Sequence, residues 1–173
     1  MAIPTLGFLK KLLDTPGPSG FEQAPARVWR EEVTSFADDV TADVHGNSVG
    51  VLNPKGKPRL MFAGHIDEIG FQITHIDEDG FLYFSGIGGW DSQVLVGQRV
   101  LLLTRAGPVR GLVGKKAIHQ LKKEDLERVT KVIDLWIDIG AAKRDEALAR
   151  VRVGGPGVLV WRVQEYPDER IVS

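Results

Sequence analysis

The 173-residue sequence contains no cysteine. Disulfides, thiolate metal sites and a cysteine nucleophile are therefore excluded, and any metal ion must be bound by histidine, carboxylate or water ligands. An excess of one charge is also missing, because 22 basic and 23 acidic side chains give a formal net charge of −1. The sequence offers no basic surface of the kind that binds nucleic acids or anionic membranes, and we expect neither as a partner.

Long apolar runs are absent as well: no stretch approaches the ~18 apolar residues of a membrane-spanning helix. The opening residues, Met1-Ala2-Ile3-Pro4, lack the charged and apolar regions of a secretory signal peptide. We therefore expect a cytoplasmic protein. With 43% apolar and 26% charged residues, the composition is that of an ordinary globular protein with one large or two small domains.

The most informative segment covers residues 60–70, where an apolar run stops at a glycine and His65, Asp67 and Glu68 follow. This pattern predicts a buried strand that carries polar side chains at its carboxyl end, where open α/β sheets place their chemistry. Extended backbone points His65 and Asp67 to the same side, so His65 could bind a metal while Asp67 orients it. The alternative is a hydrogen-bonded pair that caps the strand end, since one imidazole is short of the three or four ligands of a zinc site.

Helical spacing of apolar residues predicts two helices before this segment. The first is expected to end before residue 15, with Thr5 as its cap. In the second, Ser19 and Glu22 have capping-box spacing, and the apolar stripe continues to about Phe36. Because a proline is tolerated only in the first turn of a helix, Pro25 favours a start near Glu22.

Alternating patterns and glycine-rich turns predict mostly β structure elsewhere. A hairpin is expected over residues 40–52, and His45 lies in its turn, where we interpret it as a solvent-facing residue and not as a ligand. No helical period appears from residue 70 until about residue 121, which indicates a β-rich barrel or sandwich. Further strands are expected at residues 71–76, 81–84, 94–97, 100–103, 109–113, 132–140, 151–154 and 158–163, and short helices at 121–129 and 145–150.

Several motifs follow one another in a particular order along the chain. Together they resemble the tetrahedral, self-compartmentalising metallo-aminopeptidases, which include FrvX-like glutamyl and lysyl aminopeptidases and are often misnamed cellulases or endoglucanases. The resemblance covers nearly the whole chain, as the amino-terminal portion of such an enzyme. The motifs are Gly-Pro-Ser-Gly-Phe-Glu at residues 17–22, Asp-Val-His-Gly-Asn at 43–47, Ala-Gly-His-Ile-Asp-Glu-Ile-Gly-Phe at 63–71, Gly-Gly-Trp-Asp at 88–91, Gln-Val-Leu-Val-Gly-Gln-Arg-Val at 93–100 and Ile-Asp-Ile-Gly at 137–140.

The resemblance implies an α/β fold with an inserted domain. Residues 1–69 and 158–173 would belong to an incomplete zinc-peptidase-like catalytic α/β layer, and residues 70–157 would form a β-barrel-like insert for dimerisation and dodecamer assembly. His65 would be the first ligand of a centre of two divalent ions, zinc or cobalt, and Asp67 the catalytic carboxylate that orients it. The implied reaction removes N-terminal residues from peptides by two-metal activation of water.

In such enzymes the remaining metal ligands lie beyond the point that corresponds to Ser173. We therefore expect the 173-residue chain to bind metal weakly or not at all by itself. The family often has Lys-Pro-Pro-His where this chain has Lys-Ala-Ile-His at residues 116–119, and His119 stays unassigned. Two alternatives are a non-catalytic binding or oligomerisation fragment built on the β-rich insert, and a glycoside hydrolase, which needs two carboxylates about 5–10 Å apart that the sequence does not single out.

Overall fold

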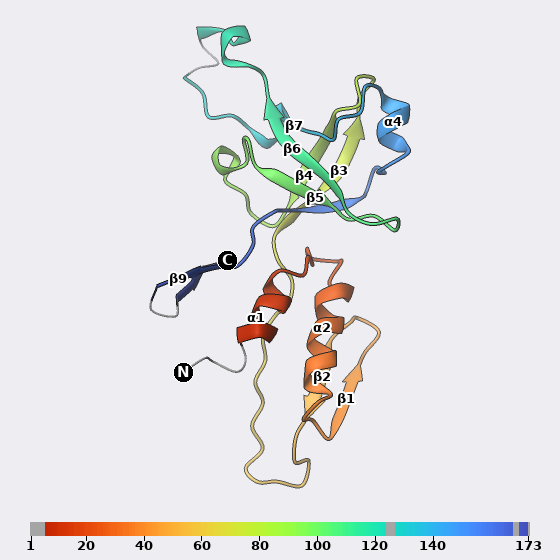
Figure 1. The fold of residues 1–173 in the computed structure, drawn as a ribbon, viewed down its shortest axis with the longest axis vertical. Coiled ribbons are helices and arrows are strands. Elements are labelled where there is room, and N and C mark those ends of the chain that lie inside the picture. Colours follow the sequence, from red (N-terminus) through yellow and green to blue (C-terminus); the bar gives the residue numbers. More distant parts are fainter. Residues whose placement is uncertain (1–5, 124–126, 168–169, 173) are drawn as a thin grey trace. The chain divides into compact units, whose positions relative to one another are not determined.

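The computed structural model describes residues 6–123, 127–167 and 170–172 (Figure 1). The chain divides into two compact units, one made of the residues up to Glu68 together with those from Trp161 onward, and the other of Ile69–Val160. Within the described residues, the first unit holds helices and short hairpins, and the second holds a closed β-barrel. The prediction of a mixed α/β chain that carries a β-barrel-like part is confirmed.

Two helices lie in the first unit, α1 (Leu6–Leu13) and α2 (Gln23–Val33), as the spacing of apolar residues predicts. Thr5, the predicted cap of the first helix, lies outside the described residues. Helix α2 ends earlier than predicted, because the chain turns after Val33. Phe36 beyond this turn is 59% exposed, so it does not extend the buried face of the helix.

The prediction that Ser19 caps α2 is wrong. Glu22 occupies the cap position and makes no side-chain cap hydrogen bond. The hydroxyl of Ser19 donates instead to the carboxylate of Asp67. The helix nonetheless starts next to Glu22, as Pro25 predicts, and Pro25 is buried in its first turn.

The predicted hairpin is present as β1 (Asp39–Ala42) and β2 (Ser48–Val51), which pair antiparallel. The carboxylate of Asp43 closes the turn by accepting the backbone N–H groups of His45 at 2.9 Å and Asn47 at 3.0 Å, and the Asn47 side-chain amide at 2.8 Å. These bonds lower the pKa of Asp43, with the Asn47 amide as the largest cause. His45 is an exposed turn residue, as predicted.

The strand predicted over residues 60–63 is not formed. Residues 59–67 have no strand assignment, and Leu60, Met61 and Phe62 are 76%, 89% and 94% exposed. A strand needs neighbours that satisfy its backbone groups. The first unit contains the β1–β2 pair and the pair β9 (Gln164–Tyr166) with β10 (Arg170–Val172), and neither pairs with this segment in the described residues.

The second unit is a closed barrel in the strand order β3-β4-β7-β6-β5-β8, in which every neighbouring pair is antiparallel (Figure 1). Closure leaves no free sheet edge, and the strands enclose one apolar core that includes Phe71, Leu82 and Ile137. The strands are β3 (Gly70–Ile76), β4 (Leu82–Ile87), β5 (Arg99–Leu102), β6 (Val109–Lys115), β7 (Leu135–Asp138) and β8 (Pro156–Leu159).

Most predicted elements of this unit are confirmed. The hairpin of residues 71–84 is the β3–β4 pair, and the strands near residues 100 and 110 are β5 and β6. The brief helix near residue 145 is α4 (Arg144–Leu148). The predicted helix of residues 121–129 includes residues 124–126, which lie outside the described residues. Short 3-10 turns are η1 (Ser92–Val94), η2 (Ile118–Gln120) and η3 (Val132–Asp134).

Two predicted strands of this unit are not formed, and two others have different bounds: the strand predicted at residues 132–140 is β7, which follows η3, and the one predicted at 158–163 is β8, which ends at Leu159. Residues 94–97 are turns instead of a strand, because the Asp91 carboxylate accepts the Gln93 N–H at 2.9 Å and starts η1. Residues 151–154 have no strand assignment and end in a turn at residues 153–154, and the following strand β8 starts at Pro156. Because β8 pairs with both β3 and β5, the barrel unit extends to Val160, past the boundary expected at residue 157. Within the described residues, no helix is long and apolar enough to cross a membrane.

Candidate metal-ligand site

His65 and Asp67 lie side by side in the segment that precedes the barrel. The Nδ1 atom of His65 is 3.0 Å from Oδ1 of Asp67 and 3.2 Å from the Asp67 carbonyl oxygen. The imidazole is 85% exposed and the Asp67 side chain 34% exposed. The structure thus brings together the two side chains that the two-residue spacing places on one side of the chain.

The two oxygens near His65 Nδ1 decide which ring nitrogen carries the proton. Both an ionised carboxylate and a carbonyl are acceptors, so Nδ1 must donate to make either bond. In a neutral imidazole the lone pair then lies on Nε2. A histidine whose second nitrogen donates to a carboxylate is the usual arrangement of a metal ligand, because the carboxylate fixes the ring and makes it more basic.

The second oxygen of Asp67 has a partner of its own. Ser19 Oγ donates to Asp67 Oδ2 at 2.5 Å. This bond is the largest cause that lowers the pKa of Asp67 from its ordinary value of 3.8; partial burial opposes the shift, and the bond with His65 adds to it. Asp67 is therefore ionised at neutral pH and able to accept the proton of His65 Nδ1.

Glu68 ties the same segment to the loop before α2. Its carboxylate accepts the Gly17 N–H at 2.8 Å, its backbone N–H donates to the Gly17 carbonyl at 3.0 Å, and its own carbonyl accepts the Ser19 N–H at 3.2 Å. Burial raises the pKa of Glu68 above its ordinary value of 4.5, and the bond from Gly17 opposes that shift. Residues 17–19 and 67–68 therefore form one hydrogen-bonded cluster.

The other histidines do not join His65 in a metal site. His45 lies in the β1–β2 turn, and His119 in the short turn η2. His75 is on β3, where its ring is 6.0 Å from that of Tyr83. Among the residues that the structure describes, no group of three or more histidine and carboxylate side chains could hold a metal ion. The donor set fits one protein ligand of a metal ion and falls short of a closed shell.

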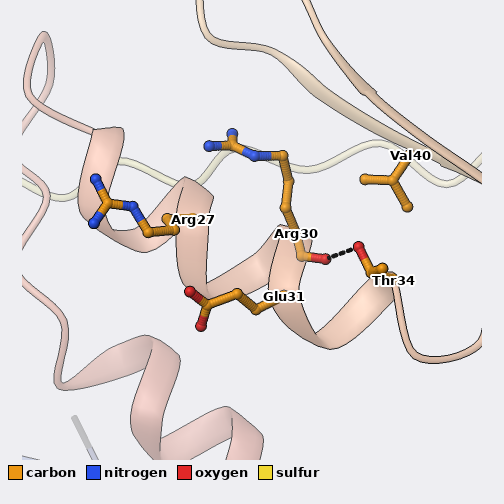
Figure 2. Close-up of a pocket in the computed structure, with 5 residues that line it drawn as sticks. All are labelled: Arg27, Arg30, Glu31, Thr34 and Val40. Carbon is orange, nitrogen blue, oxygen red and sulfur yellow. Dashed lines mark hydrogen bonds between the residues drawn. The ribbon is translucent and has the colours of Figure 1, made fainter.

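A shallow pocket beside α2 shares no lining residue with the cluster of residues 17–19 and 67–68. Figure 2 shows that Arg27, Arg30, Glu31, Thr34 and Val40 line it. Two of its charged groups are hydrogen-bonded to neighbours: the Arg30 guanidinium donates to Ser48 Oγ at 2.8 Å, and the Glu31 carboxylate accepts from Lys11 Nζ at 3.3 Å. The pocket contains neither His65 nor Asp67, and it adds no group to the candidate site.

Sequence reasoning missed the roles of Ser19 and Glu68 in this cluster. The capping-box spacing assigned Ser19 to the start of the helix, although its hydroxyl contacts Asp67. The signal that could have found it is the motif of residues 17–22, which accompanies the histidine motif in the resemblance. Two glycines in so short a motif indicate a tight loop with unusual backbone conformations, and not the start of a helix.

Most of the chain, including His65, Asp67 and Glu68, is similar in sequence to known aminopeptidases. The family model of the M42 glutamyl aminopeptidases matches residues 46–173. The FrvX protein of Escherichia coli is 35% identical over 148 residues, which are 84% of this chain and 41% of that protein. The chain therefore spans less than half the length of this curated relative.

Solved structures agree in fold. A TET aminopeptidase from a marine sediment thaumarchaeon has a TM-score of 0.91 at 35% identity, over 97% of this chain and 48% of that one. The TET1 peptidase of Pyrococcus horikoshii has a TM-score of 0.82 at 34% identity, over 92% of this chain and 48% of that one. The matched residues include the whole histidine motif and the barrel, and the chain belongs to the M42 glutamyl aminopeptidase family.

Proposed function

We propose that this chain supplies one metal ligand and the assembly domain of a metal-dependent aminopeptidase that removes N-terminal residues from peptides. His65 would bind a divalent ion, zinc or cobalt, through Nε2, while Asp67 holds the imidazole by its Nδ1 proton. The observation that carries the proposal is the 3.0 Å contact between His65 Nδ1 and Asp67 Oδ1. Membership of the M42 family supports the reaction class.

The remaining ligands would come from sequence that this chain does not contain. The chain covers 41% of FrvX and 48% of the similar TET structures, so more than half of each relative has no counterpart here. Two bound divalent ions would polarise the scissile carbonyl and lower the pKa of water to near neutrality. The residues of this chain would position one ligand: His65 would present Nε2 to the metal ion, and Asp67 would fix the orientation of the ring and its Nδ1 proton.

A first experiment uses the 173-residue chain alone. Cobalt(II) added to the chain should broaden the NMR signals of the His65 ring at lower concentrations than those of His119, because Asp67 orients the His65 ring. Binding should be weak, since a single imidazole does not close a metal site. Equal broadening of both rings would remove the support for His65 as a ligand.

A second experiment supplies the rest of the enzyme. Residues 1–173 joined to the carboxyl-terminal remainder of FrvX should hydrolyse aminoacyl anilides and bind close to two zinc ions per chain, and should not cleave cellulose oligomers. His65→Ala should lower the rate by about 10²-fold or more and reduce the zinc content, whereas His119→Ala, the matched control, should change neither. Full activity of the His65→Ala fusion would contradict the proposal.

Self-association is a second proposed property, and it holds even if the chain is not catalytic. The TET1 peptidase of Pyrococcus horikoshii assembles into a tetrahedron or an octahedral shell. On the barrel unit Val94, Leu112 and Val153 are 45%, 47% and 50% exposed, so apolar side chains are accessible to a partner subunit. We infer that the chain forms a homodimer and that such dimers can assemble into a dodecamer. We also propose that the protein is cytoplasmic. Sedimentation that shows a stable monomer at high concentration would contradict the self-association.

A further inference from the structure

We propose that Ser19 is a positioning residue for the metal ligand. Its hydroxyl holds the Asp67 carboxylate in the orientation that fixes the His65 imidazole, and the motif of residues 17–22 places that hydroxyl. The inference deepens the proposed function and rests on it for the role of His65 as a ligand. The geometry of the hydrogen-bonded chain from Ser19 to His65 can be tested without metal or substrate.

The hydrogen bonds of Asp67 divide between its two oxygens. Oδ1 faces His65 Nδ1 at 3.0 Å, and Oδ2 accepts the proton of Ser19 Oγ at 2.5 Å. A carboxylate held by one oxygen can rotate about its Cβ–Cγ bond, whereas one held by both oxygens cannot rotate without losing a bond. Ser19 therefore restricts Asp67 to one orientation.

The backbone places Ser19 opposite Asp67 through a short parallel bridge between Pro18 and Glu68. The Ser19 N–H donates to the Glu68 carbonyl at 3.2 Å, and the Glu68 N–H donates to the Gly17 carbonyl at 3.0 Å. The Glu68 carboxylate adds a third bond by accepting the Gly17 N–H at 2.8 Å. These bonds fix the register of the two segments, so the Ser19 side chain meets the residue that precedes Glu68.

The other residues of the motif shape this loop. A side chain at Gly17 would bring its Cβ within 2.3 Å of Pro25 Cγ, so only glycine lets the loop lie against the first turn of α2. Gly20 has a φ of +88°, a left-handed conformation that favours glycine. The Gly20 N–H donates to Glu22 Oε1 at 2.6 Å. The motif thus builds a tight loop with Ser19 at its contact point.

A capping role does not account for Ser19. The cap position of α2 belongs to Glu22, and its side chain bonds the loop instead of the helix. The Ser19 backbone N–H and hydroxyl both bond the segment of residues 67–68. The contacts of Ser19 therefore point to the histidine site and not to the helix.

The test measures the tautomer of His65 in the 173-residue chain by long-range ¹H–¹⁵N NMR, with His65→Gln to assign its signals. At about pH 8 an ordinary histidine is neutral, and we expect His65 to be mainly in the Nδ1–H form. Ser19→Ala should lower the ratio of the Nδ1–H to the Nε2–H form of His65 about threefold or more. The Asp67 carboxylate then loses the hydrogen bond from Ser19 that holds it in the orientation facing His65 Nδ1. Ser35→Ala, which removes a hydroxyl bonded to the Glu32 carbonyl, should leave the ratio unchanged.

A second pair of variants separates the hydroxyl from the shape of the side chain. Ser19→Thr keeps a hydroxyl and should retain the wild-type tautomer, whereas Ser19→Val has nearly the same shape without a donor and should show the lowered ratio. This comparison stays valid if Ser19→Ala disturbs the loop. A wild-type tautomer in Ser19→Val, or no Nδ1–H preference in the unmodified chain, would overturn the inference. Neither outcome depends on metal binding or activity, so failure here is distinguishable from failure of the proposed function.

Discussion

The barrel unit and the first unit differ in how they bury their apolar side chains. The barrel closes on itself and encloses a continuous core, in which Ile76, Leu82 and Leu135 are 0% exposed. Proline aside, Ala26 and Val33 are the buried apolar side chains among the described residues of the first unit. Equal hydrophobicity in the sequence thus gives unequal burial, because burial depends on whether an element finds its partners.

Residues 60–63 illustrate this difference most directly. Their sequence is as apolar as that of β3, yet Phe62 is 94% exposed whereas Phe71 is 1% exposed. Strand β3 pairs with β4 and β8 within its own unit, and residues 60–63 have no strand beside them in the described residues. The chain spans less than half the length of the relatives it matches.

The largest effect is expected from a cavity in the barrel core. Leu82→Ala should lower the free energy of unfolding of the barrel by about 2–5 kcal/mol, because Leu82 is completely buried. The matched control, Leu60→Ala, should change stability by less than about 0.5 kcal/mol in this chain. Urea denaturation followed by tryptophan fluorescence measures both. A cost above 2 kcal/mol for Leu60→Ala would show that residues 60–63 are packed.

A smaller effect is expected from a pair of glycines in the first unit. Gly17→Ala should destabilise this unit by about 1–3 kcal/mol, because the added Cβ would lie 2.3 Å from Pro25 Cγ. Gly7→Ala is the matched control on α1, where an added Cβ meets nothing within 4 Å. It should be neutral or stabilise by up to about 1 kcal/mol. Amide exchange of α2 reports on both variants, and similar effects would contradict the close packing of the loop.

The smallest effect is the pH dependence of the first unit, where Asp67 and Glu68 act in opposite directions. The pKa of Asp67 is lowered by Ser19 and His65, so its contribution to stability is present above pH 3.8 and is lost as the pH falls through its folded pKa. Burial raises the pKa of Glu68, so its contribution is present below pH 4.5 and is lost as the pH rises through its folded pKa.

Two variants separate these titrations. Asp67→Asn should reduce the loss of stability on the acid side, to which Asp43 also contributes. Glu68→Gln should remove the loss above pH 4.5 that comes from Glu68. Urea midpoints of the first unit, measured by NMR in steps from pH 3 to pH 7, give both slopes. An unchanged acid limb in Asp67→Asn would contradict the bonds that lower the Asp67 pKa.

Much of the fold could be predicted from local pattern. The β1–β2 hairpin, the β3–β4 hairpin and helix α4 follow from alternation, turn residues and helical spacing that act within a few residues. Residues 94–97 were missed because the Asp91 side chain starts a turn that apolar pattern does not encode. The strand predicted at residues 60–63 is wrong because a strand needs a paired neighbour, and none of the described strands pairs with these residues.

The candidate site could be predicted only where it depends on residues that are close in sequence. The spacing of His65 and Asp67 places both side chains on one side of the chain, and the structure brings them to 3.0 Å. The contact of Ser19 with Asp67 joins residues 48 positions apart, and it depends on the bridge between Pro18 and Glu68. No local pattern specifies such a contact, and the capping-box spacing suggested a different one.

Hydrogen exchange of the backbone amides tests the central claim most directly, namely that the barrel strands are paired with one another whereas residues 60–63 have no strand partner among the described residues. In the 173-residue chain, amides of β3 and β5 should be strongly protected, and those of residues 60–63 should exchange at rates close to those of an unstructured peptide. In the fusion to the carboxyl-terminal remainder of FrvX, residues 60–63 should become as protected as β3. Strong protection of residues 60–63 in the 173-residue chain alone would contradict the account.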